Sequence, residues 1–205
     1  ADSFAGGNGS ASNPYLISTP EQLARLAYVI NESTLNAEYK NCYYRQTRNI
    51  NMSEHWYDAI GTYTSDTEYY AFEGNYNGGG YTISGVYMTS SPGSYQGIFG
   101  YVRSPAIIRN IGLIDSEITG YQYVGGIVGF ASSGVTIGNC YNETDITSEY
   151  RYTGGIAGGS SGTITNCYNT GNIRGCGNNA GGIVGSGDAS YCYNTGPISI
   201  SSYTT

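Results

Sequence analysis

Positive charge is scarce in this chain. Lysine and arginine together number 8 against 15 aspartates and glutamates, so the formal net charge is −7. Proteins that bind nucleic acids need a basic surface to neutralise phosphates, so this composition excludes a nucleic-acid partner. Intrinsic disorder is excluded as well, because disordered chains have few aromatic residues and tyrosine alone numbers 23 here.

Long apolar runs are also missing. No segment approaches the roughly 20 apolar residues that a transmembrane helix needs, so we expect no membrane span in this chain. The opening segment, residues 1–10, is typical of a trimmed, mature N-terminus. The lack of a signal peptide therefore does not argue for a cytoplasmic protein.

Histidine occurs once, as His55. One histidine among scattered partners assembles no Ser-His-Asp or Cys-His catalytic set. Acidic residues are scattered over the second half of the chain, where a pair of carboxylates could serve glycoside hydrolysis. The calcium-binding and nucleotide-binding loop signatures are absent. We therefore assign no catalytic residue, no metal ligand and no cofactor from the sequence.

Glycine, in contrast, is abundant, with 32 residues, and part of it recurs at a fixed interval. The recurring segments are Gly97-Ile98-Phe99-Gly100, Gly126-Ile127-Val128-Gly129, Gly155-Ile156-Ala157-Gly158 and Gly182-Ile183-Val184-Gly185. Their first residues are 29, 29 and 27 positions apart. A period between about 20 and 50 residues indicates one structural unit stacked on copies of itself.

Each period contains three apolar strand positions. The first is the glycine-bounded segment, and the second begins at Ile108, Ile137 and Ile164. The third is marked by Ile118, Ile146, Ile173 and Ile198. Stacked coils bury such positions as continuous columns, with neighbouring backbones about 4.8 Å apart. We predict an all-β fold, a right-handed parallel β-helix with three short sheets and 27–29 residues per coil.

One amphipathic helix is expected before the coils, over residues 20–31. Ser18 or Thr19 can cap it, Pro20 suits its first turn, and apolar residues from Leu23 to Ile30 recur at helical spacing. We expect this helix to cover the open end of the core. The sequence thus predicts a single domain over 1–205. It comprises a lead-in with the capping helix (1–40), irregular first coils with an insertion near 57–71 (41–96), and regular coils (97–205).

Three of the five cysteines, Cys140, Cys167 and Cys192, share one repeat position. Coils stacked in register would bring them close enough for a disulfide, but small buried thiols also fill a tight core column. We favour the buried thiols. Cys42 and Cys176 lie outside this column, and no cysteine or histidine partner supports a metal site.

Two groups of residues are candidates for ligand binding. Neighbouring strand residues face opposite sides, so the tyrosines that follow the three cysteines should point outward. These are Tyr141, Tyr168 and Tyr193. They could stack against sugars or simply stabilise the sheet. Loops carry function on rigid scaffolds, so the second group is the insertion. Its candidates are Asp66, Glu68, Tyr69 and Tyr70.

An asparagine follows each tyrosine of this column. Stacked asparagines can hydrogen-bond to one another along a β-stack and to the backbone. We therefore predict a ladder formed by Asn142, Asn169 and Asn194.

The repeats resemble the GLUG motif of bacterial surface and secreted proteins. The resemblance lies in the glycine-bounded segments and in Ile137-Gly138-Asn139-Cys140-Tyr141-Asn142 with its copies. The lead-in is similar too, with Asn13-Pro14-Tyr15-Leu16-Ile17 before the helix. The resemblance covers most of the chain and implies a β-solenoid of the kind found in adhesin-like proteins and in non-catalytic regions of some immunoglobulin A peptidases. It carries no site residues over to this chain.

The resemblance implies a non-catalytic extracellular module, secreted or at the bacterial cell surface. It would be an adhesin-like scaffold or a domain that binds a carbohydrate or host ligand. A glycan or a host surface protein is the expected partner, and the chain is expected to be part of a longer protein. The alternative is a β-helix enzyme that degrades polysaccharide, a lyase or glycoside hydrolase. The sequence favours the non-catalytic module, because the four arginines of the repeat region share no repeat position. An ice-binding threonine array is disfavoured, because the Thr163-Ile164-Thr165 pattern is not repeated.

Overall fold

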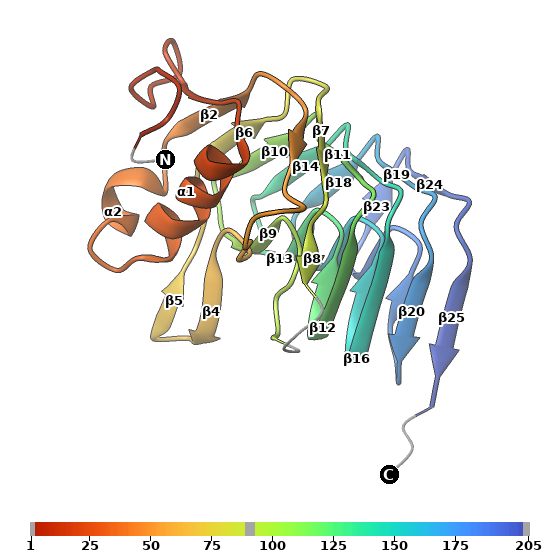
Figure 1. Cartoon of the computed structure of the whole chain (residues 1–205). Helices are drawn as coiled ribbons and strands as arrows, with labels where there is room; N and C mark the ends of the chain where they lie inside the picture. Colours follow the sequence, from red (N-terminus) through yellow and green to blue (C-terminus); the bar gives the residue numbers. More distant parts are fainter. Residues whose placement is uncertain (1–2, 89–92, 203–205) are drawn as a thin grey trace.

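A computed structural model describes residues 3–88 and 93–202. Its coils stack in chain order from one end of the molecule to the other, with the helices at the N-terminal end (Figure 1). The fold class predicted from the sequence, a parallel β-solenoid with an N-terminal helix, is confirmed. The predicted domain at 1–205 also includes residues 1–2, 89–92 and 203–205, which lie outside the described residues.

Every sheet of the solenoid is parallel, and each takes one strand from successive coils. The first sheet runs β1 (Tyr15–Ile17), β2 (Tyr43–Gln46), β6 (Asn75–Asn77), β10 (Ile107–Arg109), β14 (Thr136–Gly138), β18 (Thr163–Thr165) and β23 (Ala189–Ser190). The second runs β3 (Ile50–Asn51), β7 (Thr82–Ser84), β11 (Gly112–Ile114), β15 (Tyr141–Asn142), β19 (Tyr168–Asn169) and β24 (Tyr193–Asn194).

The other two sheets complete the coil. The third runs β8 (Tyr87–Met88), β12 (Glu117–Gly125), β16 (Asp145–Gly154), β20 (Ile173–Cys176) and β25 (Ile198–Ser201), with β21 (Ala180–Gly181) beside β16. The fourth runs β9 (Phe99–Val102), β13 (Val128–Ala131), β17 (Ala157–Ser160) and β22 (Val184–Ser186).

The coils are in register, as the repeat period predicts. The Ile127 amide donates to the Ile156 carbonyl at 3.0 Å, and the Ile156 amide donates to the Ile183 carbonyl at 2.9 Å. Ile118 pairs with Ile146, which is itself adjacent to Ile173. Equivalent isoleucines therefore stack on one another, and those of the inner coils are fully buried.

The number of sheets differs from the prediction. Within residues 3–88 and 93–202 the solenoid has four parallel sheets, not three. The sequence predicts one strand at Ile137-Gly138-Asn139-Cys140, but a corner at Asn139 ends β14 there, and β15 begins at Tyr141. Asn139 has a φ of 53°, as do Asn166 and Tyr191 in later coils, and Asn110 has 59°. Asparagine tolerates this left-handed conformation better than most residues, so it can turn the chain there.

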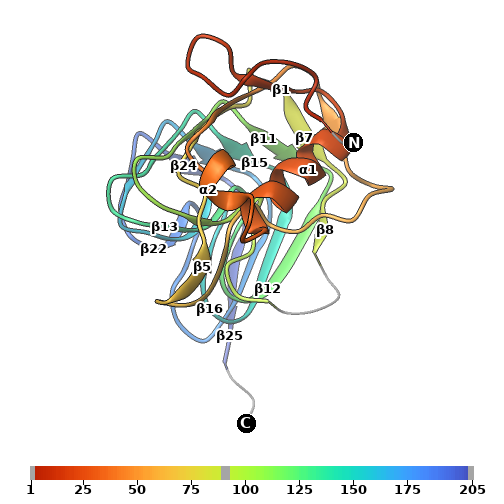
Figure 2. The same ribbon diagram turned by 90° about the vertical axis from the view of Figure 1, so that its left-hand side faces the viewer.

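Helix α1 (Pro20–Asn31) covers the N-terminal end of the core, as Figure 2 shows along the solenoid. Thr19 is its N-cap, and its side chain accepts a hydrogen bond from the Gln22 amide. Leu23, Leu26, Ala27, Val29 and Ile30 are buried. The predicted capping helix is therefore confirmed. The lead-in also contributes strand β1 and a second short helix, α2 (Asn36–Tyr39), which the sequence analysis did not predict.

The insertion near 57–71 forms the antiparallel hairpin β4 (Thr62–Ser65) and β5 (Glu68–Tyr70). It is the only antiparallel pairing among the described residues. The hairpin leaves the coil between Ile60, which bridges to Phe99, and Phe72, which bridges to Val102. It projects along the same side of the solenoid as the ends of β12 and β16 (Figures 1 and 2).

The predicted asparagine ladder lies inside the solenoid. Asn142 donates to the Asn169 side-chain oxygen at 2.7 Å, and Asn169 donates to that of Asn194 at 2.7 Å. Asn142 and Asn169 are completely buried. Cys140 and Cys167 are also buried, while Cys192 is half-buried, and all five cysteines carry free thiols. Burial raises the pKa of the Cys140 thiol.

Candidate functional site

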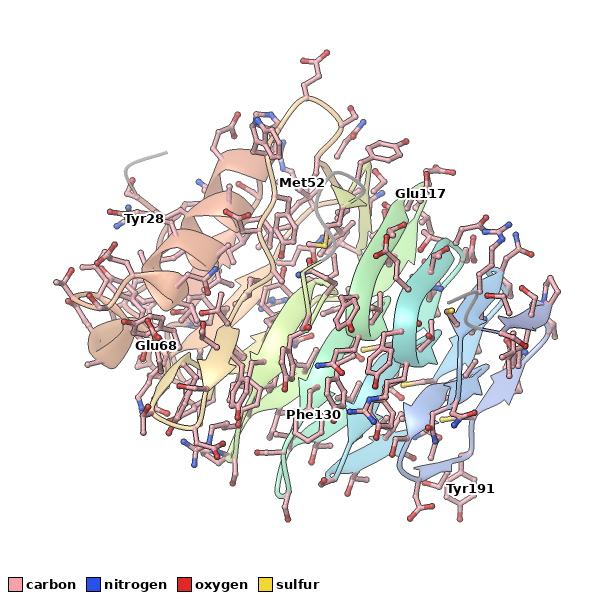
Figure 3. All side chains as sticks on the ribbon, turned by 90° about the horizontal axis from the view of Figure 1, so that it is seen from below. Tyr28, Met52, Glu68, Glu117, Phe130 and Tyr191 are labelled. Atoms are coloured by element: carbon pink, nitrogen blue, oxygen red, sulfur yellow. The ribbon has the colours of Figure 1, made fainter. Side chains whose placement is uncertain are left out.

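A cluster of aromatic side chains joins the hairpin to the flank of the coils. We call it the aromatic face. Its members are Tyr63, Tyr69, Tyr95, Tyr101, Tyr123, Phe130 and Tyr152. Figure 3 shows Phe130 midway along the solenoid, between Glu68 of the hairpin and Tyr191 of the last coil. The face therefore extends across several coils.

The centre of the face is a column of tyrosines from successive coils. The Tyr95 and Tyr123 rings stack with centroids 4.9 Å apart and planes 14° apart. Tyr123 and Tyr152 stack at 4.6 Å and 16°. All three side chains are half-buried, so each ring keeps part of its surface in solvent.

The backbone at this column is unusual. Tyr95, Tyr123 and Tyr152 have φ values of 62°, 55° and 62°, in the left-handed region that tyrosine rarely adopts. The same corner in the next coil is Asn179, with a φ of 71°. The coil therefore needs a left-handed residue here, and asparagine satisfies that need at low cost. Three coils nevertheless carry tyrosine, at a conformational cost of about 1–2 kcal/mol each.

A second row of rings lies beside this column. Tyr101 on β9 and Phe130 on β13 are nearly parallel, with centroids 6.1 Å apart. The Phe130 ring packs edge-on against Tyr123 at 5.3 Å. Edge-to-face contacts of this kind stabilise an aromatic pair and fix the orientation of each ring. The two rows thus form one continuous aromatic surface.

The hairpin completes the face. Tyr63 lies 5.0 Å from both Tyr95 and Tyr101, measured between ring centroids. Tyr69 lies 5.6 Å from Tyr101. The Tyr63 hydroxyl donates to the Asp66 carboxylate at 2.7 Å, which holds the hairpin tip and the ring together. A groove of about 420 Å³, lined in part by Asp58, Tyr63 and Tyr95, adjoins this edge of the face.

The environment changes the acidity of several of these phenols. The hydrogen bond to Asp66 raises the pKa of Tyr63 to about 12. Burial raises the pKa of Tyr95 to about 12. Burial also raises the pKa values of Tyr101 and Tyr123, and the charges of Arg103 and Arg151 oppose these two shifts. The raised pKa values keep the hydroxyls of these four tyrosines protonated at neutral pH, so they can donate hydrogen bonds.

Two arginines border the face. Arg103 donates to the Tyr69 hydroxyl, and its guanidinium carbon lies 5.0 Å from the Tyr69 ring centroid. The Arg151 guanidinium carbon lies 5.1 Å from the Tyr152 ring and 4.8 Å from Tyr150. Guanidinium groups at this distance from a ring are attracted to its face. Both cations are therefore held beside the tyrosines.

The family model of the GLUG motif matches residues 149–174 of this chain. The match runs from the end of β16 to β20, which is close to one coil of a parallel solenoid whose coils repeat in register. The chain is a GLUG-motif β-solenoid.

Solved structures and curated sequences include proteins similar to this GLUG-motif solenoid. A crystal structure of a "putative immunoglobulin A1 protease" from Bacteroides ovatus superposes with a TM-score of 0.65 over 96% of this chain and 80% of that one. The two sequences are 19% identical, so this likeness concerns the fold alone.

Two curated sequences are also similar. A "Putative Gly-rich membrane protein" of Evansella cellulosilytica is 29% identical over 57% of this chain, and "Halomucin" of Haloquadratum walsbyi is 30% identical over 87%. The matched regions span only 13% and 2% of the lengths of these two proteins.

The tyrosine column predicted from the GLUG repeats is formed, on the second sheet of the solenoid. Tyr141 and Tyr168 stack at 4.9 Å with planes 1° apart, and Tyr168 and Tyr193 stack at 5.2 Å and 6°. At one end the Tyr141 ring lies against Gly112, where an added Cβ would be 2.1 Å from the tyrosine Cζ. This column lies on β15, β19 and β24, away from the aromatic face on the third and fourth sheets.

The predicted hairpin residues are only partly brought into the aromatic face. Tyr69 belongs to it, and Asp66 contacts it through Tyr63. Glu68 is exposed and Tyr70 is half-buried in the hairpin, opposite Thr62. The role of these four residues in binding remains a prediction.

The sequence analysis missed the coil half of the face. The missed residues are Tyr95, Tyr101, Tyr123, Phe130 and Tyr152. The sequence did contain a pattern that indicates them. Tyr95, Tyr123 and Tyr152 are 28 and 29 positions apart, and each lies two or three residues before a glycine-bounded segment. The stacking of tyrosines at a common repeat position could therefore have been predicted, but their left-handed backbone could not.

Other candidate chemistry is sparse in the described part of the chain. His55 lies 3.6 Å from the Glu21 carboxylate. No group of three or more histidine, cysteine, aspartate or glutamate side chains there is arranged to hold a metal ion. Neither described helix is long and apolar enough to cross a membrane.

Proposed function

We propose that this GLUG-motif solenoid is a non-catalytic module of a larger extracellular surface protein and that it binds carbohydrate through the aromatic face. The surface location is supported by the names of the relatives, a "Halomucin" and a Gly-rich "membrane protein". The small shares of these proteins that match support a module within a longer chain.

The observation that carries the binding proposal is the tyrosine column at a left-handed corner. Asn179 satisfies the same corner without strain, so the three tyrosines are not there to turn the chain. Tyrosine offers a large, rigid surface with a polar tip, and such rings pack against the C–H faces of sugars while the hydroxyl bonds to sugar hydroxyls. The groove beside Tyr63 and Tyr95 extends this surface toward the capping helix.

The test replaces Tyr123 and Tyr152 by asparagine, the residue that the next coil carries at this corner. Affinity electrophoresis in gels containing neutral and acidic polysaccharides measures the binding. We expect the double variant Tyr123→Asn/Tyr152→Asn to bind about 10-fold or more weakly, because each lost ring contact is worth about 0.5–1.5 kcal/mol. Its thermal stability should change little, because asparagine tolerates the left-handed backbone.

The other tyrosine column provides a matched control. Tyr141→Asn/Tyr168→Asn removes the same number of stacked rings from the second sheet and should leave binding unchanged. If the control loses binding and the Tyr123/Tyr152 variant keeps it, the site lies on the other column and the proposal is wrong. Shortening of any bound polysaccharide by the purified protein would contradict the non-catalytic assignment.

A further inference from the structure

Among the described residues, most arginines of this acidic chain form no ion pair, and two of them, Arg103 and Arg151, lie at the aromatic face. Within residues 3–88 and 93–202, the ion pairs closer than 4.0 Å join Lys40 to Glu73, His55 to Glu21, and Arg174 to Asp145. Arg103 and Arg151 belong to none of them. Both cations at the aromatic face therefore lack a bound carboxylate, although acidic residues outnumber basic ones by 15 to 8.

The two guanidinium groups are held by rings instead of by acids. Arg103 rests on Tyr69 and donates to its hydroxyl. Arg151 lies against Tyr150 and Tyr152, and its Nε donates to the Gln122 side-chain oxygen at 3.5 Å. A guanidinium has five N–H donors, and these contacts use one on each arginine. Most donors of both arginines therefore stay available to a ligand.

Nearby acidic groups do not neutralise these cations. Asp66 accepts the hydrogen bond of the Tyr63 hydroxyl, and Glu68 and Glu149 are exposed. None of these carboxylates lies within 4.0 Å of either guanidinium. Each arginine therefore carries a positive charge that no carboxylate pairs and that a tyrosine ring holds in place.

The spacing of the arginines suits an extended ligand. Arg103 directly follows β9, and Arg151 lies in β16 just before β17, which is two strands farther along the fourth sheet. Neighbouring strands are about 4.8 Å apart, so the two cations are separated by roughly 10 Å along the solenoid axis. A continuous chain of ring contacts, through Tyr101, Phe130 and Tyr123, connects Tyr69 under Arg103 to Tyr152 under Arg151.

We infer that the ligand of the aromatic face is an acidic polysaccharide, with its sugar rings on the tyrosines and its anionic groups on Arg103 and Arg151. This inference rests on the proposed carbohydrate-binding function and adds the charge of the ligand. Arginine binds a carboxylate or a sulfate through parallel N–H bonds, and stacking on a ring leaves the outer edge of the guanidinium free for this. A net charge of −7 would repel a polyanion from the rest of the surface, so binding must be local.

The test compares polysaccharides that differ only in charge. The probes are polygalacturonic acid with its fully methyl-esterified form, and dextran sulfate with dextran. We expect the charged member of a pair to bind at least 10-fold more tightly than the neutral member in 50 mM salt, and the difference to shrink in 500 mM salt. The first pair reports on carboxylates and the second on sulfates.

Variants then locate the charge. Arg103→Gln and Arg151→Gln should each weaken binding of the charged polymer about 10-fold and leave any binding of the neutral polymer unchanged. Arg109→Gln is the matched control, because it removes the same charge from an exposed position on β10, in a different sheet. Arg109→Gln should change the binding of neither the charged nor the neutral polymer.

The outcomes separate the inference from the proposed function. If neutral polymers bind as tightly as charged ones and Tyr123→Asn/Tyr152→Asn loses that binding, the acidic ligand is wrong and the carbohydrate site stands. If Arg109→Gln weakens binding as much as Arg151→Gln, the charge effect is general and the inference is overturned. If no polysaccharide binds, both proposals fail.

Discussion

The asparagine column shows how a buried polar residue becomes part of the core of this solenoid. Asn169 accepts a hydrogen bond from Asn142 and donates to Asn194 and to the Gly171 carbonyl, at 2.7, 2.7 and 2.9 Å. Each side-chain amide thus satisfies its neighbour in the next coil and the backbone of its own coil. A buried amide without such partners would be costly, so the column specifies the register of the coils.

Replacing Asn169 by alanine should destabilise the protein by about 2–3 kcal/mol, because the buried Asn142 amide and the half-buried Asn194 amide each lose a partner. Denaturant unfolding monitored by circular dichroism measures this change. The neighbouring Thr170 is exposed, so Thr170→Ala should stay within about 0.5 kcal/mol of the parent. Equal losses in the two variants would show that the ladder contributes nothing.

At the scale of the coil, the recurring glycines and the asparagine column depend on each other. A Cβ on Gly155 would lie 2.4 Å from Cγ of Asn169 and 2.4 Å from the Gly182 carbonyl oxygen. A Cβ on Gly126 would lie 2.7 Å from Oδ1 of Asn142. Glycine is therefore required at these positions, because neighbouring coils and the asparagine ladder approach the backbone too closely for a side chain. This packing explains why glycine recurs at a fixed interval in the sequence.

We expect Gly155→Ala to lower the free energy of unfolding by about 2–4 kcal/mol. The Gly182 backbone of the next coil cannot move away from the added Cβ without breaking the register of the coils. Gly138 is the matched control. Its φ is ordinary, and a Cβ there would meet nothing closer than 3.8 Å. Gly138→Ala should be neutral or stabilise by up to about 1 kcal/mol, because alanine restricts the unfolded chain. A comparable loss at both glycines in thermal unfolding would refute this explanation.

The sequence predicted those strands and the helix that are marked by a regular spacing of residues. The glycine spacing places β9, β13, β17 and β22 in one sheet, and helical spacing locates α1 together with its buried face. The second sheet was missed because β15 and β19 are only two residues long, too short to show an alternating pattern. The left-handed corner that separates them from β14 and β18 depends on the stacked coils, not on the local sequence.

On the scale of the whole molecule, a helix covers the N-terminal end of the core, while apolar side chains of the last described strand are exposed. Helix α1 buries the first coils, where Ile17, Tyr44 and Ile50 are fully covered. In the last strand, Ile198 and Ile200 remain 45% and 58% exposed. The apolar columns therefore run through the molecule and are capped by the helix on the N-terminal side.

Ionisation of the buried tyrosines makes the stability of the fold vary with pH in the alkaline range. Burial raises the pKa of Tyr95 from 10.0 to about 12, and burial also raises the pKa values of Tyr44, Tyr57 and Tyr76. A raised pKa in the folded state stabilises the fold fully below pH 10, and this contribution is lost as the pH rises through 12, because the unfolded chain releases its phenolic protons first.

The free energy of unfolding should therefore fall steadily between about pH 10 and pH 12. Denaturant unfolding at several pH values, with phenolate absorbance as a second readout, measures the effect. Part of the tyrosine absorbance should appear only when the protein unfolds. A pH-independent stability, or complete phenol titration near pH 10 in the folded protein, would contradict these shifts.

The sequence by itself determined the repeat, the inward isoleucine columns, the asparagine ladder and the capping helix, because each depends on spacing within one or two coils. Only the tertiary structure decided the aromatic face. Tyr69 and Tyr152 are 83 positions apart in the chain, yet the hairpin and the coil corners bring them onto one surface through Tyr101, Phe130 and Tyr123. Such an arrangement depends on where an insertion folds back, which local periodicity does not encode.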